Sequence, residues 1–277
     1  MRDCIGCKLI YNEQFLSTDL FDKSSFMSGI ILYEVIAFYD KKYLYLEDHL
    51  QRLESSSRLA NLPLWIPIDE VRDRLLNLLM INDVSEGSIN MVFNFSKDPG
   101  TFVIYVNKPH NPSPEDYIHG IRTQLHFDIR TTPNIKFFLQ DFRERAGKVI
   151  RDNNLWEVIL VDKNDYITEA SRSNVFMIEG DTVVTAPVEL VLPGVTRKHV
   201  LEICRELNIP VRERCVTYTE LEKMDAVFLT GTTSKVLPVR YVGDWEFNAA
   251  HPVLVRIREA YEEAIRIHVA AQPPSGS

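Results

Sequence analysis

One lysine of the chain lies in surroundings that suit covalent chemistry. Lys136 stands in the stretch Asn134-Ile-Lys-Phe-Phe-Leu139, with apolar neighbours on both sides. Burial disfavours the charged form of an amine, so such a lysine is expected to have a lowered pKa. A neutral amine is what Schiff-base formation requires. The alternative is a surface lysine at a helix start, whose stem covers the phenylalanines, and on this residue alone the alternative has the greater weight.

Two segments are suited to binding a phosphate, and the first is Leu192-Pro-Gly-Val-Thr-Arg197, which opens a predicted helix. A helix N-terminus offers free N–H groups and the positive end of a dipole. Gly194 lets the backbone approach an anion closely, and the hydroxyl of Thr196 adds a donor. The alternative, favoured when the segment is taken alone, is that Thr196 only caps the helix.

The second segment is Thr230-Gly-Thr-Thr-Ser234, directly after an apolar strand. Four hydroxyls and a glycine at the carboxyl end of a strand form a donor-lined crevice of the kind that ligands use. The alternative is an ordinary polar turn. No G-x-x-x-x-G-K and no G-x-G-x-x-G occurs, so neither a P-loop nor a dinucleotide fingerprint is indicated.

A carboxylate and an arginine complete this set. Glu169 lies just before a predicted strand, where it could pair with a cationic ring nitrogen; otherwise it is a solvated turn residue. Arg52 lies on a predicted helix, and arginine suits phosphate, although an amphipathic helix often carries an arginine without a special role. Each residue alone has such an ordinary explanation. A lysine, a carboxylate, an arginine and two hydroxyl-rich anion sites together are the groups that bind pyridoxal phosphate.

The elements that must position these residues follow from the hydrophobic pattern. Predicted strands are 29–39, 88–95, 101–106, 121–127, 156–161, 174–178, 226–229 and 236–242. Predicted helices are 46–62, 69–82, 137–153, 197–207 and 251–270. Three prolines in residues 107–114 indicate a linker. The pattern predicts two α/β domains, a small one over 1–110 and a larger one over 111–277, with a disordered tail at about 271–277.

Composition sets limits on the class of protein. The chain has 277 residues, 45% hydrophobic and 25% charged, which excludes a disordered chain. A net charge of −8 gives no support for a nucleic-acid partner. No apolar run approaches the ~18–20 residues that span a bilayer, and no secretory signal opens the chain, so a cytoplasmic protein without membrane contact is expected. Cys4 and Cys7 lack a second pair at metal spacing, so no metal site is predicted.

A spaced motif resembles the class IV, or fold type IV, pyridoxal-phosphate aminotransferases. It consists of Glu169-Ala-Ser-Arg-Ser-Asn174-Val-Phe176, then Val183-Val-Thr185, then Leu192-Pro-Gly194-Val195-Thr-Arg197. The family signature has the form E-x-S-x-x-N, hydrophobic-x-T and hydrophobic-x-G-hydrophobic-x-R, and both gaps have a permitted length. The likeness runs from about residue 29 to residue 242. It implies a two-domain fold type IV enzyme, a pyridoxal 5'-phosphate cofactor, amino-acid and 2-keto-acid substrates, and a homodimer.

The resemblance also implies a role for each matching residue. Lys136 matches the lysine that binds the cofactor as a Schiff base and moves the substrate proton, with a spacing typical of the D-amino-acid branch. Glu169 matches the carboxylate that pairs with the pyridine nitrogen. The implied phosphate ligands are Arg52, Val195, Thr196 and Thr232. Tyr33 matches a tyrosine near the substrate carboxylate, and Thr233 is implied to lie beside it as a further substrate-binding residue.

The chain departs from every subgroup of the family that it resembles. The loop 96–100 lacks the Arg-x-His pair of D-amino-acid transaminases, and Asn90 stands where branched-chain transaminases place an arginine. The substrate carboxylate is therefore predicted to bind Arg172 or Lys97. A transaminase is expected. A 4-amino-4-deoxychorismate lyase and a non-catalytic small-molecule-binding relative are the alternatives.

Overall fold

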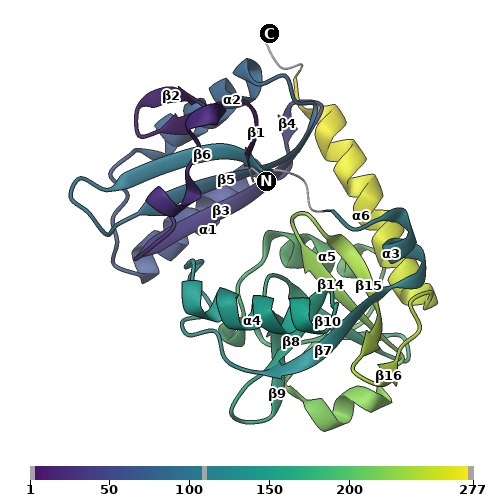
Figure 1. Ribbon diagram of the computed structural model, residues 1–277. Coiled ribbons are helices and arrows are strands. Elements are labelled where there is room, and N and C mark those ends of the chain that lie inside the picture. The colour runs from purple at the N-terminus through teal and green to yellow at the C-terminus, as the bar shows by residue number, and fades with distance from the viewer. Residues whose placement is uncertain (1–3, 108–110, 274–277) are drawn as a thin grey trace. The chain divides into compact units, whose positions relative to one another are not determined.

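Residues 4–107 and 111–273 are described by the structure, a computed structural model, and they group in two compact units (Figure 1). Unit 1 contains residues 4–107, 135–140 and 265–273, and unit 2 contains residues 111–134 and 141–264. The sequence-based division at residue 110 places 135–140 and 265–273 with the larger domain, and the structure corrects this. Phe137 pairs with Leu32 in a β-bridge, and the side-chain amide of Gln272 donates to the carbonyl of Tyr43, so both segments pack with unit 1.

Unit 1 is an antiparallel sheet in the order β2-β1-β6-β5-β3-β4, with two helices on one face. Its strands are β1 (Cys4–Tyr11), β2 (Gln14–Ser17), β3 (Ile31–Tyr39), β4 (Lys42–Tyr43), β5 (Glu86–Asn94) and β6 (Thr101–Asn107). Its helices are α1 (Leu46–Leu59) and α2 (Ile68–Ile81), with short 3-10 turns at Thr18–Leu20 and Lys23–Ser25. Because successive side chains of a strand alternate between faces, Leu32 and Ile36 pack against α1 and α2, whereas Tyr33 lies in the cluster on the opposite face.

Unit 2 is built on a ten-stranded sheet in the order β12-β11-β10-β14-β15-β7-β8-β9-β13, with β16 paired to β15. The strands are β7 (Ile121–Phe127), β8 (Glu157–Val161), β9 (Tyr166–Ala170), β10 (Asn174–Glu179), β11 (Thr182–Thr185), β12 (Val211–Glu213), β13 (Val216–Thr217), β14 (Ala226–Gly231), β15 (Lys235–Val242) and β16 (Trp245–Glu246). The helices are α3 (Pro114–His119), α4 (Gln140–Asp152), α5 (Val195–Glu206) and α6 (Pro252–Ala271), with 3-10 turns at Val188–Leu190 and Tyr218–Lys223. Gln140 of α4 and the last turns of α6, from residue 265, belong to unit 1. β9 also pairs with β10, Glu169 opposite Asn174, which closes a ring of strand pairs.

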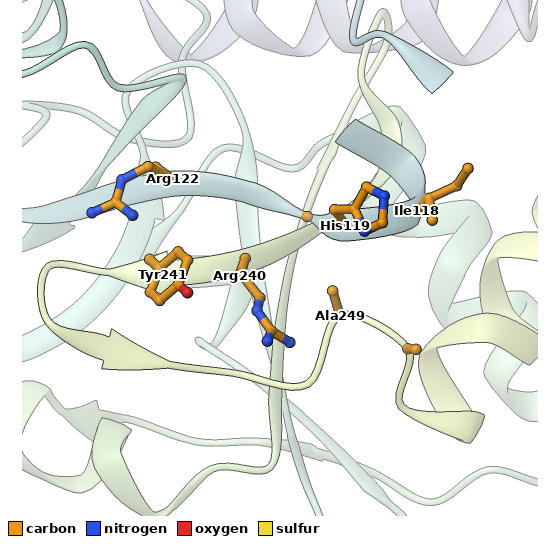
Figure 2. Close-up of a pocket in the computed structure, with 8 residues that line it drawn as sticks. Ile118, His119, Arg122, Arg240, Tyr241 and Ala249 are labelled. Atoms are coloured by element: carbon orange, nitrogen blue, oxygen red, sulfur yellow. The ribbon is translucent and has the colours of Figure 1, made fainter. Parts of the chain in front are cut away.

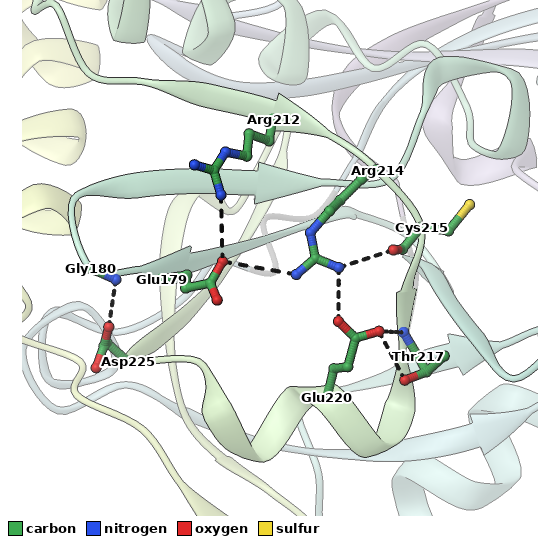
Figure 3. Close-up of polar contacts among 8 residues, drawn as sticks. All are labelled: Glu179, Gly180, Arg212, Arg214, Cys215, Thr217, Glu220 and Asp225. Carbon is green, nitrogen blue, oxygen red and sulfur yellow. Dashed lines mark hydrogen bonds and ion pairs between the residues drawn. The ribbon is translucent and has the colours of Figure 1, made fainter.

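An exposed ionic network joins β10, β12 and the turn after β13 (Figure 3). Glu179 lies 4.0 Å from Arg212 and 3.9 Å from Arg214, atom to atom. Arg214 also donates to Glu220 at 2.9 Å, and Glu220 accepts the backbone N–H of Thr217 at 3.1 Å. Exposed ion pairs of this kind contribute little to the free energy of unfolding. The network therefore contrasts with the buried ionic network of Glu34 and Arg52 in unit 1.

Most predicted elements are confirmed to within a few residues, and the differences have local causes. The helix predicted from residue 137 begins at Gln140, because 135–138 is extended beside β3. β1 was not predicted, since its alternation is interrupted at Gly6 (φ +83°) and by a register shift between Ile5 and Ile10. Short strands such as β9 and β11 were also missed, because four or five residues carry a weak periodic signal.

Several expectations concern the ends and the cysteines. The tail predicted at 271–277 begins inside α6, and residues 274–277 lie outside the described part, as do 108–110 of the predicted linker. Cys4 and Cys7 lie on β1, and neither forms a disulfide with another described residue. Within residues 4–107 and 111–273, no group of three or more His, Cys, Asp and Glu side chains is placed to hold a metal ion. No helix found in those ranges is long and apolar enough to cross a membrane.

Candidate active site

Lys136 is held in unit 1 by the extended segment that lies beside β3. The N–H of Tyr33 donates to the carbonyl of Lys136 at 3.3 Å, and the N–H of Phe138 donates to that of Ile31 at 2.9 Å. The N–H of Lys136 itself donates to Oγ of Ser56, a buried residue of α1, at 3.2 Å. This anchoring explains why a half-buried lysine that belongs to no helix has a fixed place in unit 1.

The side chains of this segment alternate as those of a strand do. Ile135 and Phe137 pack in the core against α1 and α2, so Lys136 and Phe138 emerge on the side of Tyr33. Nζ of Lys136 lies 4.7 Å from the ring centroid of Tyr33, and the ring of Phe138 meets Tyr33 edge-on at 5.9 Å. Unit 1 therefore brings the predicted lysine and the predicted tyrosine together.

Arg52 lies on the α1 side of β3, in a buried ionic network. Nε and Nη2 of Arg52 donate to the two carboxylate oxygens of Glu34 at 2.8 and 2.7 Å. Nδ1 of His49 lies 2.8 Å from Oε2 of the same carboxylate. Glu34 has no exposed surface and Arg52 only 8%. Arg52 is thus no incidental arginine of an amphipathic surface, because a two-pronged pair of this kind fixes the guanidinium plane.

The network shifts the pKa of each of its members. Burial alone would raise the pKa of Glu34, but the charge of Arg52 and hydrogen bonds from Arg52 and His49 outweigh it and hold that pKa far below its usual range. Burial lowers the pKa of His49 in spite of its bond to Glu34. The pKa of Arg52 is raised, since Glu34 outweighs the effect of burial. At neutral pH the network is therefore a carboxylate, a guanidinium and an uncharged imidazole.

Glu169 is placed at the end of β9 in unit 2. Its side chain is 3% exposed, which excludes a solvated turn residue. Oε2 accepts the backbone N–H of Leu192 at 3.1 Å, and Oε1 lies 3.8 Å from Nη1 of Arg130. A buried carboxylate of this kind can accept a hydrogen bond from a protonated ring nitrogen.

The start of α5 is fixed against the same strands. Nδ2 of Asn174 donates to the carbonyl of Leu192 at 2.9 Å. A Cβ on Gly194 would lie 2.1 Å from Oδ1 of Asn174, so any other residue here would displace the Asn174 side chain. Gly194 is the N-cap of α5 and makes no side-chain capping bond, so the alternative that Thr196 caps the helix is wrong. Val195 and Thr196 are the first two residues of the helix, both buried.

The hydroxyl-rich segment forms the turn between β14 and β15. Asn174 is opposite Thr230 in the β10–β14 pairing and opposite Glu169 in the β9–β10 pairing, so three strand ends meet here. Thr232 and Thr233 are half-buried in the turn. Oγ1 of Thr230 is buried and has no hydrogen-bond partner among the described residues. An uncapped helix start and an unpaired buried hydroxyl fit a phosphate-bearing group, because buried polar atoms otherwise find partners.

The two candidates for a substrate carboxylate partner lie at the surface. Nε of Arg172 donates to Oε2 of Glu157 at 3.2 Å, and Nη2 donates to the carbonyl of Trp156 at 3.1 Å. Arg172 is thereby tied to Glu157, which is itself buried. Lys97 is exposed in the loop between β5 and β6. Neither arrangement tests the predicted role.

Sequence reasoning overlooked several residues that position this set. Glu34 stood out as the one charge in an apolar strand, and a buried charge requires a partner, so the signal for the network was present. His49, three residues before Arg52, was given no role, and Asn174 entered only as part of the motif. Arg130 gave no signal at all, because nothing in the pattern of 128–134 relates it to Glu169.

Comparison with known proteins decides the family. A profile of amino-transferase class IV matches residues 31–242, more than half of the chain. The chain belongs to the class IV aminotransferase family. It is 29% identical to a Thermotoga maritima protein assigned as a branched-chain-amino-acid aminotransferase, over 91% of each chain. It is 25% identical to the D-alanine aminotransferase of Bacillus licheniformis, over 88% of this chain and 92% of that protein.

Solved structures agree on the fold of this class IV aminotransferase. The branched-chain aminotransferase of Thermobaculum terrenum in its pyridoxal-phosphate form has a TM-score of 0.82 at 20% identity, covering 99% of this chain and 100% of that one. A Legionella pneumophila protein assigned as a 4-amino-4-deoxychorismate lyase has a TM-score of 0.73 at 20% identity, covering 85% and 91%. The predicted fold type IV architecture is confirmed. The class IV aminotransferase family depends on pyridoxal phosphate, so the predicted cofactor and the predicted enzyme class are confirmed by membership of the family.

Proposed function

We propose that this protein is a pyridoxal-phosphate-dependent aminotransferase that moves an amino group between an amino acid and a 2-keto acid, with Nζ of Lys136 as the cofactor's Schiff-base partner. The observation that carries the proposal is the anchoring of the Lys136 segment. The segment lies in sequence between β7 and α4, but it pairs with β3 in unit 1. This pairing holds Nζ of Lys136 beside the ring of Tyr33. A structural role alone would not require a lysine at this position.

The residues proposed to bind the cofactor are those that the resemblance assigns. Arg52, oriented by Glu34, and the N–H groups at Val195 and Thr196 supply donors for a phosphate, together with the hydroxyl of Thr232. Glu169 supplies a charged carboxylate for the pyridine nitrogen. Donors of this kind attract an anion locally, so the net charge of −8 does not oppose binding.

Each of these residues has a separate role in the proposed reaction. When bound, pyridoxal phosphate supplies an aldehyde carbon that bonds amines and a ring that withdraws electrons from the substrate α-carbon. Nζ of Lys136 accepts the proton from that α-carbon and later donates it, acting first as base and then as acid. Glu169 keeps a proton on the ring nitrogen by accepting its hydrogen bond. Tyr33, Thr233 and Arg172 are the proposed contacts of the substrate, and a homodimer is the proposed assembly.

A half-reaction screen tests this proposal. Purified holoenzyme is mixed with single L- and D-amino acids, and the absorbance of the lysine-bound cofactor is followed. The relatives make branched-chain L-amino acids and D-alanine the first substrates to test. A transaminase loses the band with at least one amino acid and regains it with a 2-keto acid.

Two other results would replace the proposal. Release of pyruvate from 4-amino-4-deoxychorismate without an amino acceptor would identify a lyase. No amino-acid-dependent change of the band with any substrate would identify a binding protein without catalysis. Arg172→Ala tests the carboxylate contact: the KM for the amino acid should rise about tenfold, as expected when a charge-assisted pair is lost, and an unchanged KM would remove Arg172 from the site.

A further inference from the structure

Unit 2 contains a cavity that none of the proposed cofactor or substrate residues lines. Its volume is about 440 Å³, and its walls include Ile118, His119, Arg122, Arg240, Tyr241 and Ala250 (Figure 2). This volume lies in the range of roughly 300–1,000 Å³ that small-molecule sites have. The residues that line the cavity include two arginines and no carboxylate. The cavity is therefore a candidate for an anion.

A β-bulge in β15 lies at the wall of this cavity. In the β15–β7 pairing, Val239 is opposite Ile121 and Tyr241 is opposite Arg122, so Arg240 is the extra residue of β15. In a regular strand, Arg240 and Tyr241 would point to opposite faces. A bulge re-aims one side chain and is common beside functional sites. Here it lets Arg240, Tyr241 and Arg122 line the same cavity.

Small residues keep the cavity open. Gly120 has a φ of +78°, and a Cβ at that position would lie 2.8 Å from the backbone nitrogen of Arg240. The same Cβ would lie 3.0 Å from Cβ of Ala249. The backbone conformation and the close approach thus both require glycine here. Ala249 and Ala250 add little side-chain volume to the walls.

The charges around the cavity are unbalanced. The Cζ atoms of Arg122 and Arg240 lie 4.6 and 5.9 Å from the ring centroid of Tyr241, so one ring has two cations around it. Arg240 is paired with Glu246. Across the described part of the chain, Arg122 forms no ion pair. Two guanidinium groups with one carboxylate leave a local positive charge, which an anion would neutralise.

We propose that this cavity binds a small organic anion whose phosphate or carboxylate group pairs with Arg122 and Arg240. Both groups present the oxygen pair that a guanidinium fork matches. The apolar part of such a ligand would contact Ile118 and the alanines. This site is separate from the proposed cofactor residues, and the inference does not depend on the proposed function.

Calorimetric titration of the holoenzyme, freed of excess cofactor, tests the site. The probes are phenyl phosphate and benzoate, which share a ring and differ in the anionic group. Saturable binding of one molecule per chain is expected for at least one probe, and the stronger binder identifies the preferred group. Arg122→Gln should weaken this binding about tenfold or more, since a charge-assisted pair is lost. Ala250→Phe should weaken it equally by filling the cavity while both arginines remain.

Arg212→Gln is the matched control, because Arg212 is an exposed arginine of unit 2 that does not line the cavity. It should leave the affinity within about twofold, as surface charges remote from a site act weakly. Equal affinity of the wild-type protein and both cavity variants would place the anion elsewhere and overturn the proposal. Lack of saturable binding by either probe up to about 10 mM, the limit of a weak specific site, would also overturn it.

Discussion

The two units position their proposed cofactor residues by different means. In unit 1, Arg52 is placed by two charge-assisted bonds to Glu34, which is fully buried. In unit 2, Glu169 and Thr196 are placed by backbone N–H groups, strand ends and a helix start. Removing one charge in unit 1 leaves an unpaired buried ion, whereas removing one hydroxyl in unit 2 removes one contact. Substitutions in unit 1 should therefore reduce stability, and those in unit 2 should reduce cofactor affinity.

Burial, and not the mere presence of ion pairs, distinguishes these regions. Unit 2 has an ionic network of its own, formed by Glu179, Arg212, Arg214 and Glu220, but its members are partly or largely exposed (Figure 3). Water screens such pairs. The comparison predicts that equivalent substitutions in the two networks differ several-fold in their effect on stability.

The largest effect is expected from Glu34→Gln. Breaking a buried ion pair by neutralising one partner typically costs about 3–5 kcal/mol, because Arg52 keeps a buried charge. Thermal and urea unfolding of the apoprotein measure the loss. Glu47→Gln is the control in the same unit, since Glu47 of α1 is exposed and pairs with Arg72 at 2.9 Å. Equal losses of stability in the two variants would contradict burial as the cause of the effect.

Lowering the pH should reduce the difference in melting temperature between the wild-type protein and Glu34→Gln. The pKa of Glu34 in the folded protein lies below its ordinary value of 4.5, since Arg52 and His49 outweigh the effect of burial. A carboxylate with a lowered pKa contributes its full stability above the ordinary value, and the contribution is lost as the pH falls below it. Melting temperatures of both proteins from neutral pH downward should converge below pH 4.5. A constant difference would show that Glu34 is not the group responsible.

A smaller effect, on affinity rather than stability, is expected from Thr196→Val. Valine keeps the shape of the buried side chain and removes one hydroxyl from the α5 start. The dissociation constant of pyridoxal phosphate should rise about tenfold, the effect of one lost hydrogen bond to a charged group. Titration of the apoprotein followed by fluorescence measures it, and Thr219→Val, on an exposed threonine of unit 2, should change nothing. A large loss of stability with an unchanged dissociation constant would show that Thr196 has a structural role and does not bind the cofactor.

The smallest effect is expected from Glu220→Gln. Hydrogen bonds from the backbone of Thr217 and from Arg214 lower the pKa of Glu220. Because the group is exposed, its pair with Arg214 should contribute under about 1 kcal/mol, and less at high salt. Unfolding at low and high ionic strength measures this contribution. A loss of stability as large as that of Glu34→Gln would show that burial does not explain the difference between the two ionic networks.

The sequence predicted the elements whose periodicity is long and simple. The strand over 121–127 agrees with β7 at both ends, and the helix predicted over 69–82 differs from α2 by one residue at each end. Lys136, Glu169 and Thr196 were singled out because residue type and spacing already limit their chemistry. Their combination already indicated pyridoxal phosphate, and the family motif then assigned a role to each of them.

The rest depends on pairings between residues far apart in the chain. The return of 135–140 to unit 1 is set by Leu32 and Phe137, whose bridge has no local signal. The contact of Arg130 with Glu169 joins a loop to a strand that the pattern did not relate. Glu34 could have been found, because a carboxylate within an apolar strand requires a buried partner.

The most direct test of the proposed active site maps the lysine that binds the cofactor. Holoenzyme is reduced with borohydride, digested with protease and analysed by mass spectrometry for the peptide that carries the pyridoxyl group. The account predicts the group on Lys136, and loss of both the adduct and the visible band in Lys136→Ala. An adduct on another lysine, or an unchanged band in Lys136→Ala, would contradict the account.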